Sequence, residues 1–220
     1  MKKKVKKTNL FKKSLLVLEI DNAPKINALD IDIIDNLIEE ISTIKKNNLA
    51  KCLVIKGYKN TAFSSGADLK EIKNLSSEKK FTIFNSKLNN LIKTFNSLTL
   101  PKVAIVNSYC FGAGFIVALC CDVIIGSDQS EYCIPASKLG IKIHKFQLNH
   151  LKKNINSRFL KDILITGRKF SASEAYKFNI INHIYKEKFS LSKIYKLYVS
   201  DILKNSSEIN KYFINNLRTN

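Results

Sequence analysis

The sequence predicts an α/β fold in which helices pack against the faces of a sheet. Short apolar runs rich in Val and Ile, typical of buried strands, alternate with longer segments in which apolar residues recur at helical spacing. Gly and Pro separate several of these segments. The 220 residues, 45% of them hydrophobic, suffice for one domain with a sizeable core.

The first half of the chain predicts strands and helices in alternation. Residues 14–20 (SLLVLEI) and 52–56 (CLVIK) are short apolar runs that we interpret as strands. Between them, residues 34–45 place Ile and Leu on one helical face and charged side chains on the other. A second amphipathic helix is predicted over residues 81–95, and Pro101 prevents it from continuing.

The second half predicts further strands and then mainly helices. Residues 102–107 (KVAIVN) and 122–126 (DVIIG) are strand-like, and the apolar segment 115–121 between them is compatible with a helix. Beyond residue 145 the clearest helical candidates are residues 157–164 and 173–178.

Three regions follow from these patterns. Residues 1–13 are expected to form a flexible basic tail, because lysines dominate them and they lack the features of a secretory signal peptide. Residues 14–145 make up a β/α core, and residues 146–220 a helical C-terminal region. No apolar run reaches the roughly 18 residues of a membrane-spanning helix, so we expect no membrane span.

The charge of the chain raises the question of nucleic-acid binding. Lys and Arg number 37 against 18 Asp and Glu, a net charge of +19. Arginine, the side chain preferred for bidentate phosphate contacts, stands only at 158, 168 and 218. We therefore interpret most lysines as solvated, and nucleic-acid binding through the basic surface is kept only as a weaker alternative function.

The cysteines indicate a reduced, cytoplasmic protein. There are 5 of them, and their spacing fits neither a metal site nor a redox motif. Most lie in apolar stretches, where a free thiol packs as a small hydrophobic group. We recognise no metal-ligand constellation and expect no metal.

Two turns of small residues carry the candidate chemistry. They are residues 63–70 (FSSGADLK) and 107–115 (NSYCFGAGF), and each follows a strand-like run. Small side chains let a ligand approach the backbone closely, and the second turn opens into a helix-compatible segment. Two convergent N–H donors can form an oxyanion hole that stabilises an enolate made from a thioester. Either turn alone is more often plain structure.

Together with other segments in matching order, these turns resemble the crotonase (enoyl-CoA hydratase/isomerase) superfamily over roughly residues 12–186. The matching segments are Ala28-Leu29, 62–70, 101–126, 135–140, 166–168, 171–175 and 179–183. The resemblance implies a crotonase-like spiral of β-β-α units, here with a shortened C-terminal region. It also implies an acyl-CoA or acyl-carrier thioester as substrate, CoA being part of that substrate with no further cofactor, and a homotrimer or hexamer.

The resemblance also assigns site residues. It implies that the N–H groups of Ala67 and Ala113 bind the thioester oxygen, with alanine at 113 where the family usually has glycine. Lys25 and Lys70 match positions that reach the CoA phosphates, and a solvated surface charge is the alternative for both. The remaining substrate-binding positions are Ala28, Gly66, Asp68, Gly112 and Gly114. Asp68 also suits the cap of a following helix.

The most informative departures concern proton transfer. The family's hydratases use two glutamates, and Ile116 and Ala136 stand at those positions. Because a general acid or base contributes about 10²–10⁴-fold, ordinary hydration is not expected. Isomerase- or decarboxylase-type chemistry is favoured, and a catalytically inactive acyl-CoA-binding or scaffold paralogue is the alternative. His144, where dienoyl-CoA isomerases carry an aspartate, is a candidate proton carrier or else a helix-start or surface histidine.

Overall fold

The computed structural model describes residues 4–10, 14–47, 49–70 and 77–217 and confirms the α/β class. The larger sheet has the strand order β1-β2-β3-β4-β6-β9, parallel throughout except for the antiparallel pair of β1 and β2. Its strands are β1 (Lys4–Leu10), β2 (Leu15–Asp21), β3 (Cys52–Gly57), β4 (Lys102–Val106), β6 (Val123–Ser127) and β9 (His183–Tyr185). A smaller sheet, in the order β5-β7-β8, consists of β5 (Tyr109–Phe111), β7 (Glu131–Cys133) and β8 (Lys169–Ser171).

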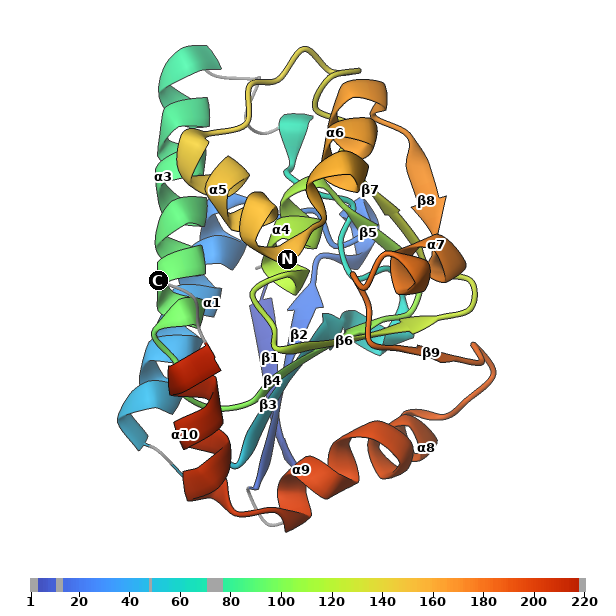
Figure 1. The fold of residues 1–220 in the computed structure, drawn as a ribbon. Coiled ribbons are helices and arrows are strands. Elements are labelled where there is room, and N and C mark those ends of the chain that lie inside the picture. Colours follow the sequence, from blue (N-terminus) through green and yellow to red (C-terminus); the bar gives the residue numbers. More distant parts are fainter. Residues whose placement is uncertain (1–3, 11–13, 48, 71–76, 218–220) are drawn as a thin grey trace.

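Helices flank the larger sheet on both faces (Figure 1). One core includes residues of α1 (Ile31–Asn47), α3 (Ser77–Asn96), α4 (Gly112–Ala118), α5 (Lys145–Asn154), α6 (Ser157–Thr166) and α7 (Ala172–Lys177). The opposite face is covered by α8 (Leu191–Ile194), the π-helical segment η3 (Tyr195–Val199) and α9 (Ser200–Lys204), and α10 (Ser207–Leu217) follows. Two 3₁₀ turns, η1 (Ala23–Lys25) and η2 (Tyr58–Asn60), complete the elements.

Strand β2 shows why the central strands read as continuous apolar runs. Leu16 and Leu18 join the core beneath α1 and α3, whereas Leu15 and Val17 join the core beneath α8 and η3. A parallel sheet covered on both faces leaves no polar side to its strands. The strands and helices expected in residues 14–126 are present, and their boundaries differ from the expected ones by a few residues.

The expected flexible tail is wrong for residues 4–10, which form strand β1 at the edge of the sheet. The sequence of this strand, KVKKTNL, lacks an apolar alternation because an edge strand needs little burial. Its lysines are paired instead: Lys6 Nζ lies 2.8 Å from Asp21, and Lys7 Nζ lies 2.9 Å from Glu40. Residues 1–3 and 11–13 lie outside the described residues.

The region after residue 145 contains the expected helices and two strands besides. The helices predicted over residues 157–164 and 173–178 are α6 and α7. Ser171 and Glu174 form a reciprocal capping box at the start of α7. Strands β8 and β9 have 3 residues each, too few for a periodic signal.

Candidate active site

The two small-residue turns meet backbone to backbone. Ser64 N–H donates to the carbonyl of Tyr109 (3.1 Å), and Phe111 N–H donates to the carbonyl of Ser64 (2.9 Å). Gly66 has a φ of +104°, and a Cβ there would lie 3.1 Å from the Phe111 carbonyl oxygen. Glycine is required at this position both for its backbone conformation and for this close approach.

Gly114 fixes helix α4 against the first turn. A Cβ at this position would lie 2.5 Å from the Cβ of Ser64, well inside van der Waals contact. The preceding residue, Ala113, lies within the helix and outside the positive-φ conformations, so its Cβ costs no backbone strain. The chain therefore keeps glycine where α4 touches the turn and tolerates alanine one residue earlier.

The backbone N–H groups of Ala67 and Ala113 donate no hydrogen bond to the described backbone. Around Ala67, Leu29 N–H donates to the Gly66 carbonyl (2.7 Å) and Asp68 N–H donates to the Leu29 carbonyl (2.8 Å). Ala113 is the second residue of α4, where helical N–H groups have no partner within the helix. Neither N–H bonds to any residue that the structure describes.

Both amides belong to residues that line one cavity, of about 100 Å³. Gly66 and Gly112 lie beside them in its wall. Much of the lining is apolar and includes Leu69, Phe81, Phe84, Leu88, Ile134 and Ile143. The turns that the sequence singled out thus line one cavity with a largely apolar wall.

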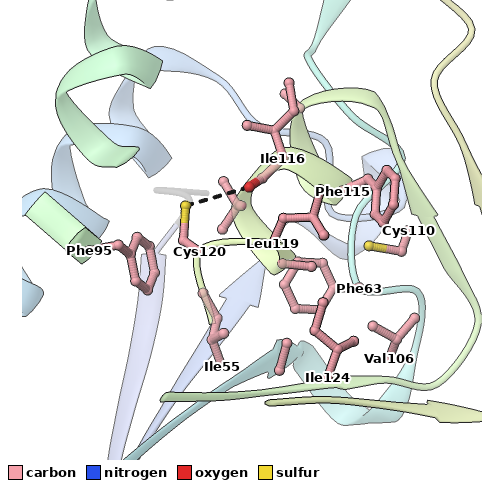
Figure 2. Close-up of a cluster of buried hydrophobic side chains, with 14 of the residues drawn as sticks. Ile55, Phe63, Phe95, Val106, Cys110, Phe115, Ile116, Leu119, Cys120 and Ile124 are labelled. Carbon is pink, nitrogen blue, oxygen red and sulfur yellow. Dashed lines mark hydrogen bonds between the residues drawn. The ribbon is translucent and has the colours of Figure 1, made fainter. Parts of the chain in front are cut away.

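The two positions of the missing glutamates also face this cavity. Ile116 and Ala136 both line it, the former almost completely buried at 4% exposure. Figure 2 shows the Ile116 side chain extending from α4 away from Ile55 and Ile124 of the core. Of the described residues, no carboxylate or histidine lines the cavity, and its polar lining is Ser65, Asn85, Lys142 and Gln147.

The remaining predicted site residues lie around the cavity rather than in its wall. Lys25 and the buried Asp68 form an ion pair that joins η1 to the first turn. Lys70 is exposed in the helix that begins at Leu69, so Asp68 stands at the position of a helix cap. Ala28 is buried beside the turn.

The structure does not bring His144 to the cavity. His144 is exposed at the start of α5, where its Nδ1 accepts a hydrogen bond from the backbone N–H of Phe146 (3.2 Å). The same nitrogen lies 3.1 Å from Nδ2 of Asn89. Its position matches the alternative of a helix-start histidine, while its neighbour Ile143 lines the cavity.

His150 and Cys120 form a buried contact behind α4. His150 Nε2 lies 3.2 Å from the Ile116 carbonyl oxygen and 3.7 Å from Sγ of Cys120. Burial lowers the pKa of His150 below its ordinary value, opposed by the hydrogen bond to Ile116. Burial raises the pKa of Cys120 to about 12, so its thiol stays protonated and packs as a hydrophobic group. All 5 cysteines are free.

Asn85 and Gln147 were missed at the level of sequence. Asn85 stands on α3 between Phe81 and Leu88, within the apolar face of that helix. A polar residue on the apolar face of a helix can indicate a site residue. The periodicity of residues 81–95 contained this signal at Asn85. Within the described residues, no cluster of His, Cys, Asp and Glu could hold a metal.

The family profile of enoyl-CoA hydratase/isomerase proteins matches residues 11–220, nearly the whole chain. The chain belongs to the enoyl-CoA hydratase/isomerase family. The crotonase-like architecture expected from the sequence is likewise found in solved structures. An enoyl-CoA hydratase from Bacillus anthracis superposes with a TM-score of 0.89 at 19% identity, covering 96% of this chain and 81% of that one. For an enoyl-CoA hydratase/carnithine racemase from Magnetospirillum magneticum the TM-score is 0.88, at 18% identity over 93% and 76% of the two chains.

Curated relatives within this family match part of their own length. Carnitinyl-CoA dehydratase of Escherichia coli K12 is 30% identical over 172 residues, 78% of this family member and 64% of the dehydratase. Crotonyl-CoA hydratase of Syntrophomonas wolfei is 25% identical over 185 residues, 83% and 70% of the two proteins. The chain thus spans less than two thirds of the dehydratase. Of the described helices, none is both long and apolar enough to cross a membrane.

Proposed function

We propose that this enoyl-CoA hydratase/isomerase family member binds an acyl-CoA thioester, its acyl oxygen accepting hydrogen bonds from the N–H groups of Ala67 and Ala113. The supporting observation is that two backbone amides without acceptors belong to abutting turns that line one apolar cavity. In a cavity with a largely apolar wall, fixed donors stabilise the negative charge of an enolate better than water does. No cofactor beyond the CoA of the substrate enters this proposal.

The proposed chemistry is loss of CO₂ from a 2-carboxyacyl thioester. Hydration and double-bond isomerisation both require a group that moves a proton at the acyl chain, and Ile116 and Ala136 cannot do so. Decarboxylation forms the enolate by breaking the C–C bond to the carboxylate, whose electron pair passes to the thioester carbonyl. The enolate carbon then takes a proton from water, so the reaction needs no carboxylate base.

Lysines near the first turn support binding of the CoA part. Lys25 is 42% exposed at its side chain, and Lys70 is exposed in the next helix. Lys70 belongs to the same turn as Ala67, and Lys25 is ion-paired with Asp68, the residue that follows Ala67. The net charge of +19 adds a favourable long-range field for a polyanionic phosphate group.

The test offers malonyl-CoA, methylmalonyl-CoA, crotonyl-CoA and a 3-enoyl-CoA to the purified protein. We expect CO₂ release from a 2-carboxyacyl thioester and no hydration of crotonyl-CoA above background. An amide-to-ester exchange at Ala113, which removes the N–H and keeps the shape of the chain, should lower the decarboxylation rate by about 10²–10³-fold. Failure of every thioester to bind would contradict the proposal.

A second candidate function is binding without turnover, and the cavity itself favours it. Its described lining holds no carboxylate or histidine, and Lys142 is its one charged side chain. Tight, saturable binding of these thioesters with no product from any of them would establish a binding or scaffold role.

Assembly as a homotrimer or hexamer is part of the same proposal. Ile209 and Phe213 of α10 are 51% and 52% exposed, apolar area that a neighbouring subunit would cover. Mass measurement over a range of protein concentrations tests this.

A further inference from the structure

A chain of side-chain amides connects α3 to α5 at the wall of the cavity. Gln147, 3% exposed on α5, places its Nε2 3.1 Å from Oδ1 of Asn85 and 3.1 Å from Oδ1 of Asn89, both on α3. Asn89 Nδ2 in turn lies 3.1 Å from Nδ1 of His144. Gln147 and Asn85 line the cavity, and His144 is the exposed end of the chain.

A backbone group sets the direction of these hydrogen bonds. The N–H of Phe146 is a fixed donor, so Nδ1 of His144 must be an acceptor. Only the NH₂ of Asn89 can face that lone pair, which leaves the Asn89 carbonyl to accept from Gln147. The Gln147 NH₂ therefore donates one hydrogen to Asn89 and the other to the carbonyl of Asn85.

Two amide atoms remain outside this arrangement: the carbonyl oxygen of Gln147 and the NH₂ of Asn85. Neither bonds to any of the described residues. No fully enclosed side-chain N or O in the described part of the chain lacks a partner, so these two atoms must border an open space. Gln147 is almost completely buried and Asn85 is half-buried, and both side chains belong to residues that line the cavity.

On this inference, Gln147 offers one acceptor and Asn85 one donor to the cavity, whose other polar lining residues are Ser65 and Lys142. An alkyl chain seated there leaves both groups unpaired, and burying an unpaired polar group is costly. A carboxylate satisfies the Asn85 donor but repels the Gln147 oxygen, since it has no hydrogen to give. A hydroxyl or a carboxamide satisfies both.

We propose that this cavity selects acyl chains that carry a neutral hydrogen-bonding group, a hydroxyl or a carboxamide, which Gln147 and Asn85 recognise. The inference rests on the proposed binding of acyl-CoA thioesters and names the substrate class of that site. Gln147 and Asn85 act here as specificity-determining residues and take no part in bond breaking.

The experiment compares thioesters of equal size by titration calorimetry. The pairs are 4-hydroxybutyryl-CoA with pentanoyl-CoA and 5-hydroxypentanoyl-CoA with hexanoyl-CoA, with succinyl-CoA as the carboxylate. At least one hydroxyacyl-CoA should bind about 10-fold or more tightly than its alkyl counterpart, and also more tightly than succinyl-CoA. Gln147→Met, equal in size but without polar atoms, should abolish or reverse this preference.

The controls separate this inference from the proposed function. Asn149→Met, at an exposed position of the same helix, should leave the preference unchanged, and Asn85→Leu should reduce it if Gln147→Met does not fold. Alkyl thioesters that bind the unmodified protein as tightly as both hydroxyacyl counterparts, or succinyl-CoA that binds most tightly, would overturn the inference alone. Absence of binding by all five would overturn the proposed function with it.

Discussion

At the scale of single residues, the identities of Ile116 and Ala136 limit the chemistry of the site. Both side chains line the cavity, so the departure from the glutamate pair lies where a substrate would be bound. Under the proposed function, neither position can supply the acid or base that hydration needs, because an alkyl group cannot exchange a proton.

Restoring the pair should restore hydration. In the double variant Ile116→Glu, Ala136→Glu we expect crotonyl-CoA hydration to rise by about 10²–10⁴-fold over the unmodified protein, measured by loss of the enoyl absorbance. Either single variant should gain far less, since the two carboxylates act as a unit. The matched double variant with Gln at both positions has the same shape and no proton to transfer. Equal activity in the two double variants would contradict the assignment.

His150 makes folding stability depend on pH. Burial lowers its pKa in the folded state, while in the unfolded state the pKa is near 6.5. As the pH falls below about 6.5, the unfolded chain therefore binds a proton that the folded protein resists, and stability decreases until the folded pKa is passed. Above pH 7 this effect is absent, because His150 is neutral in both states.

Urea unfolding of the unmodified protein and of His150→Gln at pH 7.5 and pH 5.5 measures this effect. The loss of stability between these pH values should be smaller in His150→Gln. His183→Gln, which removes an exposed histidine of β9, should keep the full loss. An identical loss in all three proteins would show that His150 does not contribute.

At the scale of elements, an ion pair between a buried lysine and a partly exposed aspartate joins β4 to the start of β6. Lys102 is 1% exposed, and its Nζ lies 2.8 Å from a carboxylate oxygen of Asp122. The backbone N–H of Lys102 donates to the same carboxylate (2.8 Å). The ammonium thus sits within the core of the sheet with Asp122 as its counter-charge.

Removing the two partners should have unequal effects. Asp122→Ala leaves the Lys102 charge buried without its partner and should cost about 3–5 kcal/mol of unfolding free energy. Lys102→Met should cost much less, because Asp122 is 33% exposed and remains hydrated. The exposed pair of Lys169 and Glu131 gives the comparison: Glu131→Ala should change stability by less than about 1 kcal/mol. Equal costs for Asp122→Ala and Lys102→Met would argue against this account.

At the scale of the whole molecule, the charge of +19 opposes compact folding. Like charges that are spread over one surface repel each other, and salt screens that repulsion. We expect the melting temperature to rise between about 20 mM and 300 mM NaCl, since the Debye length shortens from roughly 20 Å to below 10 Å. A falling melting temperature would mean that the surface ion pairs outweigh the net repulsion.

Much of this molecule could be predicted from its sequence because the signals are local. Strands buried on both faces, such as β3 and β4, are continuous apolar runs, and α1 and α3 carry their apolar faces in their periodicity. Strand β1 could not be predicted, because it forms through pairing with β2 rather than through its own pattern. The small sheet of β5, β7 and β8 escaped prediction for a different reason: each of its strands has only 3 residues, too few for a periodic signal.

By itself, the sequence determined the α/β alternation and the two turns around Gly66 and Gly112, which depend on residue type and spacing along the chain. Its resemblance to the family added that Ile116 and Ala136 stand where hydratases carry glutamates. The tertiary structure alone decided that the turns abut, that His144 caps α5 outside the cavity, and that Gln147 meets Asn85 across two helices. These are contacts between residues far apart in the chain, fixed by packing of the core, and no local pattern of side chains encodes them.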